Sequence, residues 1–427
     1  MRAKPHLFYG WWIVVAGFLI VAYGTGAGEY MSSQLPDLLK EFGGSAITIG
    51  TAFSIYLLTG RIALLAIGPL IDRFGPRKLM FIGIPLASIG FLCLSFVNNM
   101  PMLYIILGAL LGIGISAGFL LPVQTATANW FIRRRSIALA VICAASVLGE
   151  SITLLSGEQI ANQFGWKGAF SGLGVAMLVI CIPLAFVIRH RPEQYGYLPD
   201  GELAVKEGTN QPLIEQGNRV SEVNFTLWRA LKTKSFWMLT VATALASGTG
   251  VMATIFRMPF LIDIGFSQAA ITDIFRIAPL MGLAGILLFG YLGDRFPKRY
   301  LLAIAIALQS ASVVVLMTAG NIVQLYTYTL VYGLGSGTVP LILAIRADYF
   351  GRRSFATITV VMMFIGSLIG IPLSMPWSPL ASWILDVTGS YQLVFMLSIL
   401  IGFIPAAVFF YARPPKPPQS VLPPTAS

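Results

Sequence analysis

The sequence predicts an all-α integral membrane protein, with twelve transmembrane helices in two pseudo-symmetric six-helix bundles. Its composition is 56% hydrophobic and only 11% charged, and an average soluble domain carries about twice that charge. Twelve stretches approach or exceed the roughly 20 apolar residues that a helix needs to cross the hydrocarbon core. Sequence features also recur in the same order in the two halves. Because the apolar runs are continuous and do not alternate, helices are favoured over barrel strands.

The expected spans form two groups of six, joined by a polar linker. The N-terminal half, 1–190, is predicted to hold spans at 10–33, 47–71, 79–97, 102–129, 136–161 and 167–188. The C-terminal half, 235–412, is predicted to hold spans at 235–262, 268–292, 300–319, 323–346, 354–384 and 391–412. Segment 191–234 is polar and rich in Gly, Pro, Glu and Asn, which predicts a cytoplasmic linker. The Pro-rich segment 413–427 is predicted to be a disordered cytoplasmic tail.

The net charge of +11 follows the predicted topology. Lys and Arg cluster in alternate loops, and the loops around Asn98–Pro101 and Asn321 carry no basic residue. This positive-inside bias places both termini in the cytoplasm of a multi-pass protein of the cell's inner membrane. The basic residues therefore indicate orientation in the lipid bilayer, and we expect no nucleic-acid partner.

Cofactors and metal ions are not expected. Cys93, Cys143 and Cys181 all fall in apolar runs, without metal-ligand spacing or a disulfide framework. No G-x-x-x-x-G-K-[ST] phosphate loop is present, so ATP-driven transport is not supported. We also expect no enzyme activity, because no catalytic cluster lies outside the expected transport cavity.

One motif occurs twice, about half the chain apart. Residues 68–78 read GPLIDRFGPRK and residues 290–299 read GYLGDRFPKR. Both copies resemble the loop signature between the second and third helices of each half in the major facilitator superfamily. Residues 130–136, WFIRRRS, also recur as residues 349–354, YFGRRS. The resemblance implies two parallel halves with the substrate bound between them near mid-membrane, moved by alternating access.

Three further segments resemble the bacterial oxalate/formate antiporter and monocarboxylate transporter branch of that superfamily. They are FYGWW at 8–12, DRFGPR at 72–77 and RPEQYGYLPDG at 191–201. The branch implies transport of small organic anions, either with a proton or by exchange. Its common Arg in the eighth span is replaced here by Ile286, so Arg61 or Arg276 would have to supply that cation.

The twin motif marks the expected gate. Asp72 and Asp294 lie at cytoplasmic helix ends, where a carboxylate can face the positive end of a neighbouring helix or pair with basic side chains. The resemblance implies a latch that holds the halves in the outward-facing state. The alternative is a charge cluster that only fixes topology. The basic residues assigned to this gate are Arg73, Arg77, Arg295, Arg133 and Arg134.

Arg61 is the leading candidate for binding an anionic substrate. It lies about 16 Å along an ideal helix from Asp72, near the bilayer centre, where a charge costs about 2.5–3.5 kcal/mol. Its planar guanidinium suits a carboxylate. The alternative is a structural ion pair, for example with Glu150. Arg276 is a second anion candidate, although it could pair with Asp273 instead. Tyr56 and Gln124 are assigned to the same substrate site.

Glu150 is the leading candidate for proton coupling. It lies on a polar face of the fifth span, where a desolvated carboxyl can take up and release a proton. A permanent interhelical ion pair is an equally weighted alternative. Glu29, near the outer end of the first span, is the second candidate.

The sequence therefore predicts a monomeric secondary active transporter of a small organic anion, such as a monocarboxylate. A proton-coupled exporter of drug-like or amphipathic compounds is one alternative. A membrane receptor without net transport is the other. An exporter should tolerate loss of Arg61, whereas a receptor would normally carry a larger cytoplasmic domain than 191–234.

Overall fold

The computed structural model is mostly helical in the part of the chain that it describes, with loops and turns between the helices. That part comprises residues 8–34, 38, 41, 46–201, 224–374, 383–384, 387–388 and 390–416. The chain divides into two compact units. Unit 1 comprises 1–222 and 352–360, whereas unit 2 comprises 223–351 and 361–427. Each unit is described by itself. The short stretch 352–360 belongs to unit 1 although it lies far along the sequence.

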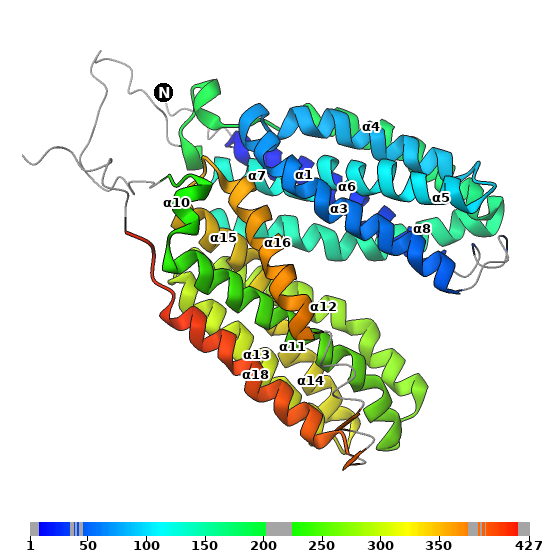
Figure 1. Ribbon diagram of the computed structural model, residues 1–427, viewed down its shortest axis with the longest axis vertical. Coiled ribbons are helices and arrows are strands. Elements are labelled where there is room, and N and C mark those ends of the chain that lie inside the picture. Colours follow the sequence, from blue (N-terminus) through cyan, green and yellow to red (C-terminus); the bar gives the residue numbers. More distant parts are fainter. Residues whose placement is uncertain are drawn as a thin grey trace, which may run out of the picture. The chain divides into compact units, whose positions relative to one another are not determined.

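Unit 1 is a bundle of long apolar helices that run alongside one another (Figure 1). Its first helices are α1 (Tyr9–Ser33), α3 (Ala46–Phe74) and α4 (Pro76–Leu94). A continuous helical stretch follows as α5 (Met100–Ile105), the π-helical η1 (Ile106–Gly112), α6 (Ile113–Gly118) and α7 (Leu120–Trp130). The unit continues with α8 (Arg135–Ala176), the π-helical η2 (Met177–Cys181) and α9 (Ile182–Ala185). Two short 3₁₀ turns close it, η3 (Pro192–Tyr195) and η4 (Pro199–Gly201).

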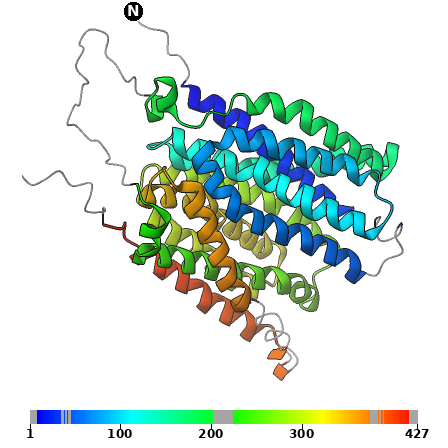
Figure 2. The same cartoon turned by 45° about the horizontal axis from the view of Figure 1, so that its top comes forward.

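Unit 2 repeats this pattern of apolar helices. It begins with the short α10 (Leu227–Leu231), followed by α11 (Lys234–Asp263) and α12 (Gln268–Gly293). Next come α13 (Lys298–Met317), α14 (Ile322–Gly335) and α15 (Thr338–Phe350). The last long helices are α16 (Phe355–Ser374), whose first turns belong to unit 1, and α18 (Gln392–Tyr411). Figure 2 shows the same helices from a second direction.

The observed helices account for the twelve expected spans. In the described chain, nine helical segments have the length and apolar composition to cross a bilayer. One of them, Arg135–Ala185, contains two expected spans in 51 residues. Gly165 divides it, because its φ of 71° and ψ of 171° are not helical. Helices α11 and α16 supply the remaining two spans. The all-α, twelve-helix prediction is therefore confirmed.

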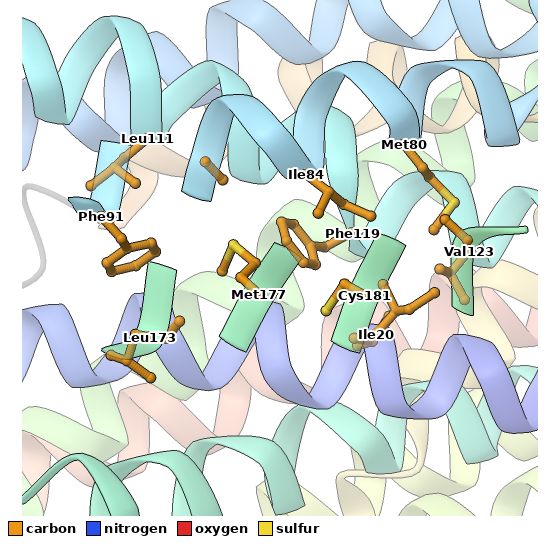
Figure 3. Packing of buried hydrophobic residues seen from close by; sticks show 14 of the residues in the cluster. Ile20, Met80, Ile84, Phe91, Leu111, Phe119, Val123, Leu173, Met177 and Cys181 are labelled. Atoms are coloured by element: carbon orange, nitrogen blue, oxygen red, sulfur yellow. The ribbon is translucent and has the colours of Figure 1, made fainter. Parts of the chain in front are cut away.

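Glycines let the helices of unit 1 approach one another closely. A Cβ atom added to Gly149 of α8 would overlap the backbone of Ala22 in α1, and one added to Gly26 of α1 would overlap Gly149 and Thr153. In lipid, such close backbone contact replaces the hydrophobic driving force that is available in water. Beside this crossing, Ile20 of α1, Ile84 and Phe91 of α4 and Met177 form part of the apolar core (Figure 3).

The crossing of α1 and α8 yields a stability prediction. Gly149→Ala places a methyl group against immovable backbone, so it should lower the thermal unfolding temperature of the detergent-solubilised protein by several degrees. The matched control is Gly50→Ala in α3, where nothing lies within 4 Å of the added Cβ. That control should be neutral or stabilising by about 0.5–1 kcal/mol. Equal unfolding temperatures for the two variants would contradict the close crossing.

Candidate gating and substrate sites

Asp72 caps the N-terminus of α16. One carboxylate oxygen of Asp72 accepts a hydrogen bond from the backbone N–H of Ala356 at 3.1 Å. The other accepts from the N–H of Thr357 at 2.8 Å and from the Thr357 hydroxyl at 2.6 Å. The first N–H groups of a helix have no partner within that helix, and its N-terminus attracts negative charge. All of these groups belong to unit 1.

The close approach of α3 to the start of α16 depends on Gly68. A Cβ atom there would lie 3.2 Å from the carbonyl oxygen of Ala356 and 3.3 Å from the Cα of Thr357. A small apolar cluster, which includes Ile67, Ile71, Ala356 and Val360, packs around the contact. The first residue of the repeated motif therefore provides space, and its acid provides the cap.

The basic residues of the motif do not neutralise Asp72 directly. Within the described chain, no ion pair joins Asp72 to a basic side chain. The guanidinium of Arg73 lies over the ring of Phe74 at 5.1 Å, and that of Arg77 lies 5.1 Å from the ring of Phe186. Of the two kinds of contact expected for Asp72, the structure therefore shows the one with a helix end.

The loop that precedes α8 has a different acidic cap, which the sequence analysis missed. The carboxylate of Asp200 accepts hydrogen bonds from the backbone N–H groups of Ile132, Arg133 and Arg134, at 3.1, 2.9 and 3.4 Å. The side chains of Arg133 and Arg134 are exposed. Asp200 has a φ of 62°, a left-handed conformation that Asp tolerates better than most residues. The repeat of WFIRRRS as YFGRRS was the sequence signal for this second cap, because two similar helix starts can each use an anionic cap.

The segment after α9 is fastened to unit 1 by several further contacts. The guanidinium of Arg189 lies between the rings of Tyr9 and Tyr195, at 4.0 and 4.2 Å. The indole of Trp130 donates a hydrogen bond to the Arg189 carbonyl at 3.1 Å. Residues 189–200, expected in part to be linker, therefore form an ordered part of unit 1.

An ion pair links this segment to the loop before α16. Arg352 pairs with Glu193 at 2.9 Å and also donates to the backbone carbonyl of Asn129 at 2.7 Å. The loop before α16 thus contacts α7 and η3 as well as Asp72. Four separate stretches of the sequence therefore converge at the basic end of unit 1.

Arg61 lies exposed on α3, and no ion pair involves it in the described chain. The expected alternative, a pair with Glu150, is not present between these two described residues. A guanidinium at this depth is costly unless water or an anion solvates it. Among the residues that the structure describes, no carboxylate pairs with the Arg61 guanidinium.

Glu29 and Glu150, the two proton-coupling candidates, lie close enough to interact electrostatically. The α1–α8 crossing at Gly26 and Gly149 brings their helices together. Tyr56 of α3 also interacts electrostatically with Glu29. Neither carboxyl forms an ion pair with a cation among the described residues.

The remaining substrate candidates are Gln124 and Arg276. Gln124 is buried in α7, with 7% of its surface exposed. Arg276 of α12, in unit 2, forms an ion pair with Asp273 at 3.3 Å, and both side chains are mostly exposed. The pairing considered for these two residues is therefore present.

The second copy of the motif lies at the end of α12. Asp294 follows that helix directly and is half-buried, and the guanidinium of Arg295 lies 4.2 Å from the ring centre of Tyr291. Arg346 of α15, which the sequence suggests is a gate or orientation charge at the end of the tenth span, is only 3% exposed. Its Nε atom is buried and has no hydrogen-bond partner in the described chain. No group of three His, Cys, Asp or Glu side chains in the described chain could hold a metal ion.

Comparison with known proteins identifies the family. The model of the Major Facilitator Superfamily matches residues 14–375 and 263–426. The chain belongs to the major facilitator superfamily. It is therefore a multi-pass membrane transporter and not an enzyme.

The chain is similar over most of its length to curated monocarboxylate transporters. Monocarboxylate transporter 12-B of Danio rerio is 24% identical, over 91% of this chain and 84% of its own length. Monocarboxylate transporter 2 of Rattus norvegicus is 23% identical, over 93% of this chain and 81% of its own length. Among solved structures, a proton:xylose symporter of the superfamily has a TM-score of 0.70 at 14% identity, covering 95% of this chain and 96% of its own. The fucose:proton symporter of E. coli has a TM-score of 0.66 at 14% identity, and the match covers 93% of this chain and 97% of the symporter. These structures confirm the fold.

The cap on α16 yields a first functional prediction. Asp72→Asn keeps one hydrogen-bond acceptor and removes the charge, so the N–H groups of Ala356 and Thr357 should be held more weakly, by about 1 kcal/mol. We expect slower transport by a folded protein. Glu158→Gln, which removes an exposed acid in α8, is the control. Transport at the wild-type rate by Asp72→Asn would contradict a gating role.

His190, just beyond α9, yields a pH prediction. Burial, aided by the positive charge of Arg191, lowers the pKa of its imidazole to about 4 from an ordinary value of 6.5. Between these values the unfolded chain binds a proton that the folded chain does not, so stability should fall as the pH drops from 6.5 to 4. Thermal unfolding of His190→Asn should depend less on pH in that window. An identical pH dependence for the variant and the wild type would refute this.

Proposed function

We propose that the protein is a secondary active carrier of a small monocarboxylate, coupled to protons. The observation that carries the proposal is Arg61, a guanidinium near the middle of a membrane span with no anion among the described residues. A guanidinium presents parallel N–H donors that fit both oxygens of a carboxylate. Relatives over more than 90% of the chain are named monocarboxylate transporters, which supports the same class of substrate.

Proton coupling is proposed for Glu29 and Glu150. Neither carboxyl forms an ion pair with a cation in the described chain, which supports a role in which one of them takes up a proton during the transport cycle. Uptake and release of that proton would give the site two states of different charge. Anion exchange is the alternative coupling mode, and it would not need this proton.

The gating proposal combines Asp72 with the start of α16. We propose that the cap is present in one state of the transport cycle and is broken in another. Asp294 and Arg295 of unit 2, and Arg133 and Arg134 of unit 1, are proposed to take part in gating as well. By the charge bias of the loops, the basic end of unit 1 is proposed to face the cytoplasm, as are both termini.

An exporter of cationic or amphipathic compounds remains the second candidate. The observation that favours it is the pair of carboxyls without a cation, since acidic residues in a cavity attract cations. Such a carrier would not need Arg61, whereas a carboxylate carrier would.

The test of the substrate class is uptake by reconstituted liposomes of labelled mono- and dicarboxylates, with and without a proton gradient. We expect saturable uptake of a monocarboxylate that Arg61→Ala abolishes. Arg61→Lys keeps the positive charge but loses the parallel N–H donors of the guanidinium, so it should weaken the apparent affinity for the monocarboxylate by about tenfold. Thermal unfolding of each variant verifies folding. Wild-type carboxylate uptake by a folded Arg61→Ala would reject the assignment, and Arg276 would be tested next.

The coupling role of Glu150 has a separate test. Glu150→Gln should lose accumulation driven by a proton gradient while retaining exchange of labelled for unlabelled substrate, because the neutral amide cannot release a proton. Glu158→Gln, at an exposed position of the same helix, is the matched control. Full gradient-driven accumulation by Glu150→Gln would exclude Glu150 as the coupling residue and turn attention to Glu29.

A further inference from the structure

A basic cavity of about 770 Å³ opens at the end of unit 1 where the α16 cap lies. It lies between the end of α3, the start of α4, the segment after α9 and the start of α16. Its lining residues are Pro69, Asp72, Arg73, Phe74, Lys78, His190, Arg191, Gln194, Arg353, Ser354 and Thr357. All of them belong to unit 1.

The charge of this basic cavity is strongly positive. Arg73, Lys78, Arg191 and Arg353 come from four different segments and converge on it. Among the described residues that line it, Asp72 is the only acid, and both of its oxygens already accept hydrogen bonds from the start of α16. No described carboxylate forms an ion pair with Arg73, Lys78 or Arg191. Cations drawn together in this way repel one another unless an anion joins them.

Two polar atoms in the lining are buried and lack partners. The Nε of Arg191 and the Nδ1 of His190 make no hydrogen bond in the described chain. The His190 ring packs against Gly75, where an added Cβ would lie 3.2 Å from the ring, and Gly75 has a φ of 89° that favours glycine. His190 is thereby fixed at the cavity wall. Burial lowers its pKa to about 4, so the ring is neutral at physiological pH.

We propose that the basic cavity binds the phosphate group of an anionic ligand. Several cations converge on one space, which suits an anion with three or more oxygens better than a single carboxylate. Arginine forks match phosphate geometry, and lysine adds a point charge. The cavity is much larger than one phosphate ion, so it leaves room for the rest of a phosphate-bearing molecule. It also lies at the ends of the spans, the level at which lipid headgroups meet a membrane protein.

This ligand would also act on the gate. Arg353 lines the same cavity and lies just before the helix that Asp72 caps, so a phosphate held by Lys78 and Arg191 would lie beside the start of α16. Binding would therefore favour the state in which α16 is capped. This site is separate from Arg61 and Glu150, so it does not depend on the identity of the transported substrate.

The test uses the full chain in nanodiscs made of phosphatidylcholine alone. Thermal unfolding is measured on adding inorganic phosphate or pyrophosphate, with acetate at equal ionic strength as the comparison. A second series replaces part of the lipid with phosphatidylglycerol. Protection by phosphatidylglycerol alone identifies a lipid headgroup as the ligand, and protection by the soluble ions identifies a soluble phosphate. Either result supports the site.

Lys78→Gln is the informative variant because its side chain is exposed and its loss should not disturb folding. It should unfold like the wild type without ligand, and it should bind the protective phosphate about tenfold more weakly. Lys232→Gln removes an equally exposed lysine outside the cavity and should bind like the wild type. Arg191→Gln changes a residue on another wall of the cavity and should also weaken the binding of the protective phosphate.

Three results would overturn the proposal. The first is that no phosphate-bearing compound raises the unfolding temperature of the wild type. The second is equal weakening by Lys78→Gln and Lys232→Gln, which would mean diffuse attraction to surface charge. The third is equal protection by acetate, which would mean that the cavity binds small anions generally.

Discussion

The basic end of unit 1 is organised around one interaction, the carboxylate of Asp72 on the first N–H groups of α16. Those N–H groups lack helical partners, and water is scarce beside a membrane span. An acid from another helix is therefore an effective cap, because it satisfies the donors and complements the helix dipole together. The contact needs Gly68, because a side chain at that position would crowd the backbone at the start of α16. The loop just before α16 is held to the same unit by the ion pair between Arg352 and Glu193.

The repeated basic loops of the chain show two solutions to the same physical problem. The loop before α16 receives Asp72 from a distant helix, whereas the loop before α8 receives Asp200 from the segment after α9. Neither loop has to rely on its own side chains as a cap. One consequence is that stretches far apart in sequence are held together by single acids. A contact of this kind can be broken and remade at moderate cost, which is useful at a gate.

Residue periodicity and composition predicted the helices well, because a lipid environment leaves few alternatives to a helix. The α8 region differs, since two expected spans form one helical stretch divided only by the backbone of Gly165. The repeated motif predicted that Asp72 would face a helix end. It could not predict which helix, because that contact joins residues far apart in the chain. Asp200 was missed for the same reason.

The membrane-embedded candidates were partly predictable. A lone Arg61 in an apolar span is visible from sequence, but the lack of a protein anion beside it is a property of packing. The proximity of Glu29 to Glu150 depends on the crossing of α1 and α8 at two glycines. No spacing within either helix reveals that crossing. Arg346 shows the same limit, because only the structure shows that its guanidinium is buried.

Hydrogen–deuterium exchange of the peptide that covers the start of α16 is the most direct test of the central claim. Slow exchange at Ala356 and Thr357 reports the cap, and opening of the cap exposes those N–H groups to solvent. The account predicts slow exchange in the resting protein and faster exchange at this segment when a transported monocarboxylate is added. It also predicts fast exchange without substrate in Asp72→Asn. Exchange that is the same in all three samples would contradict the account.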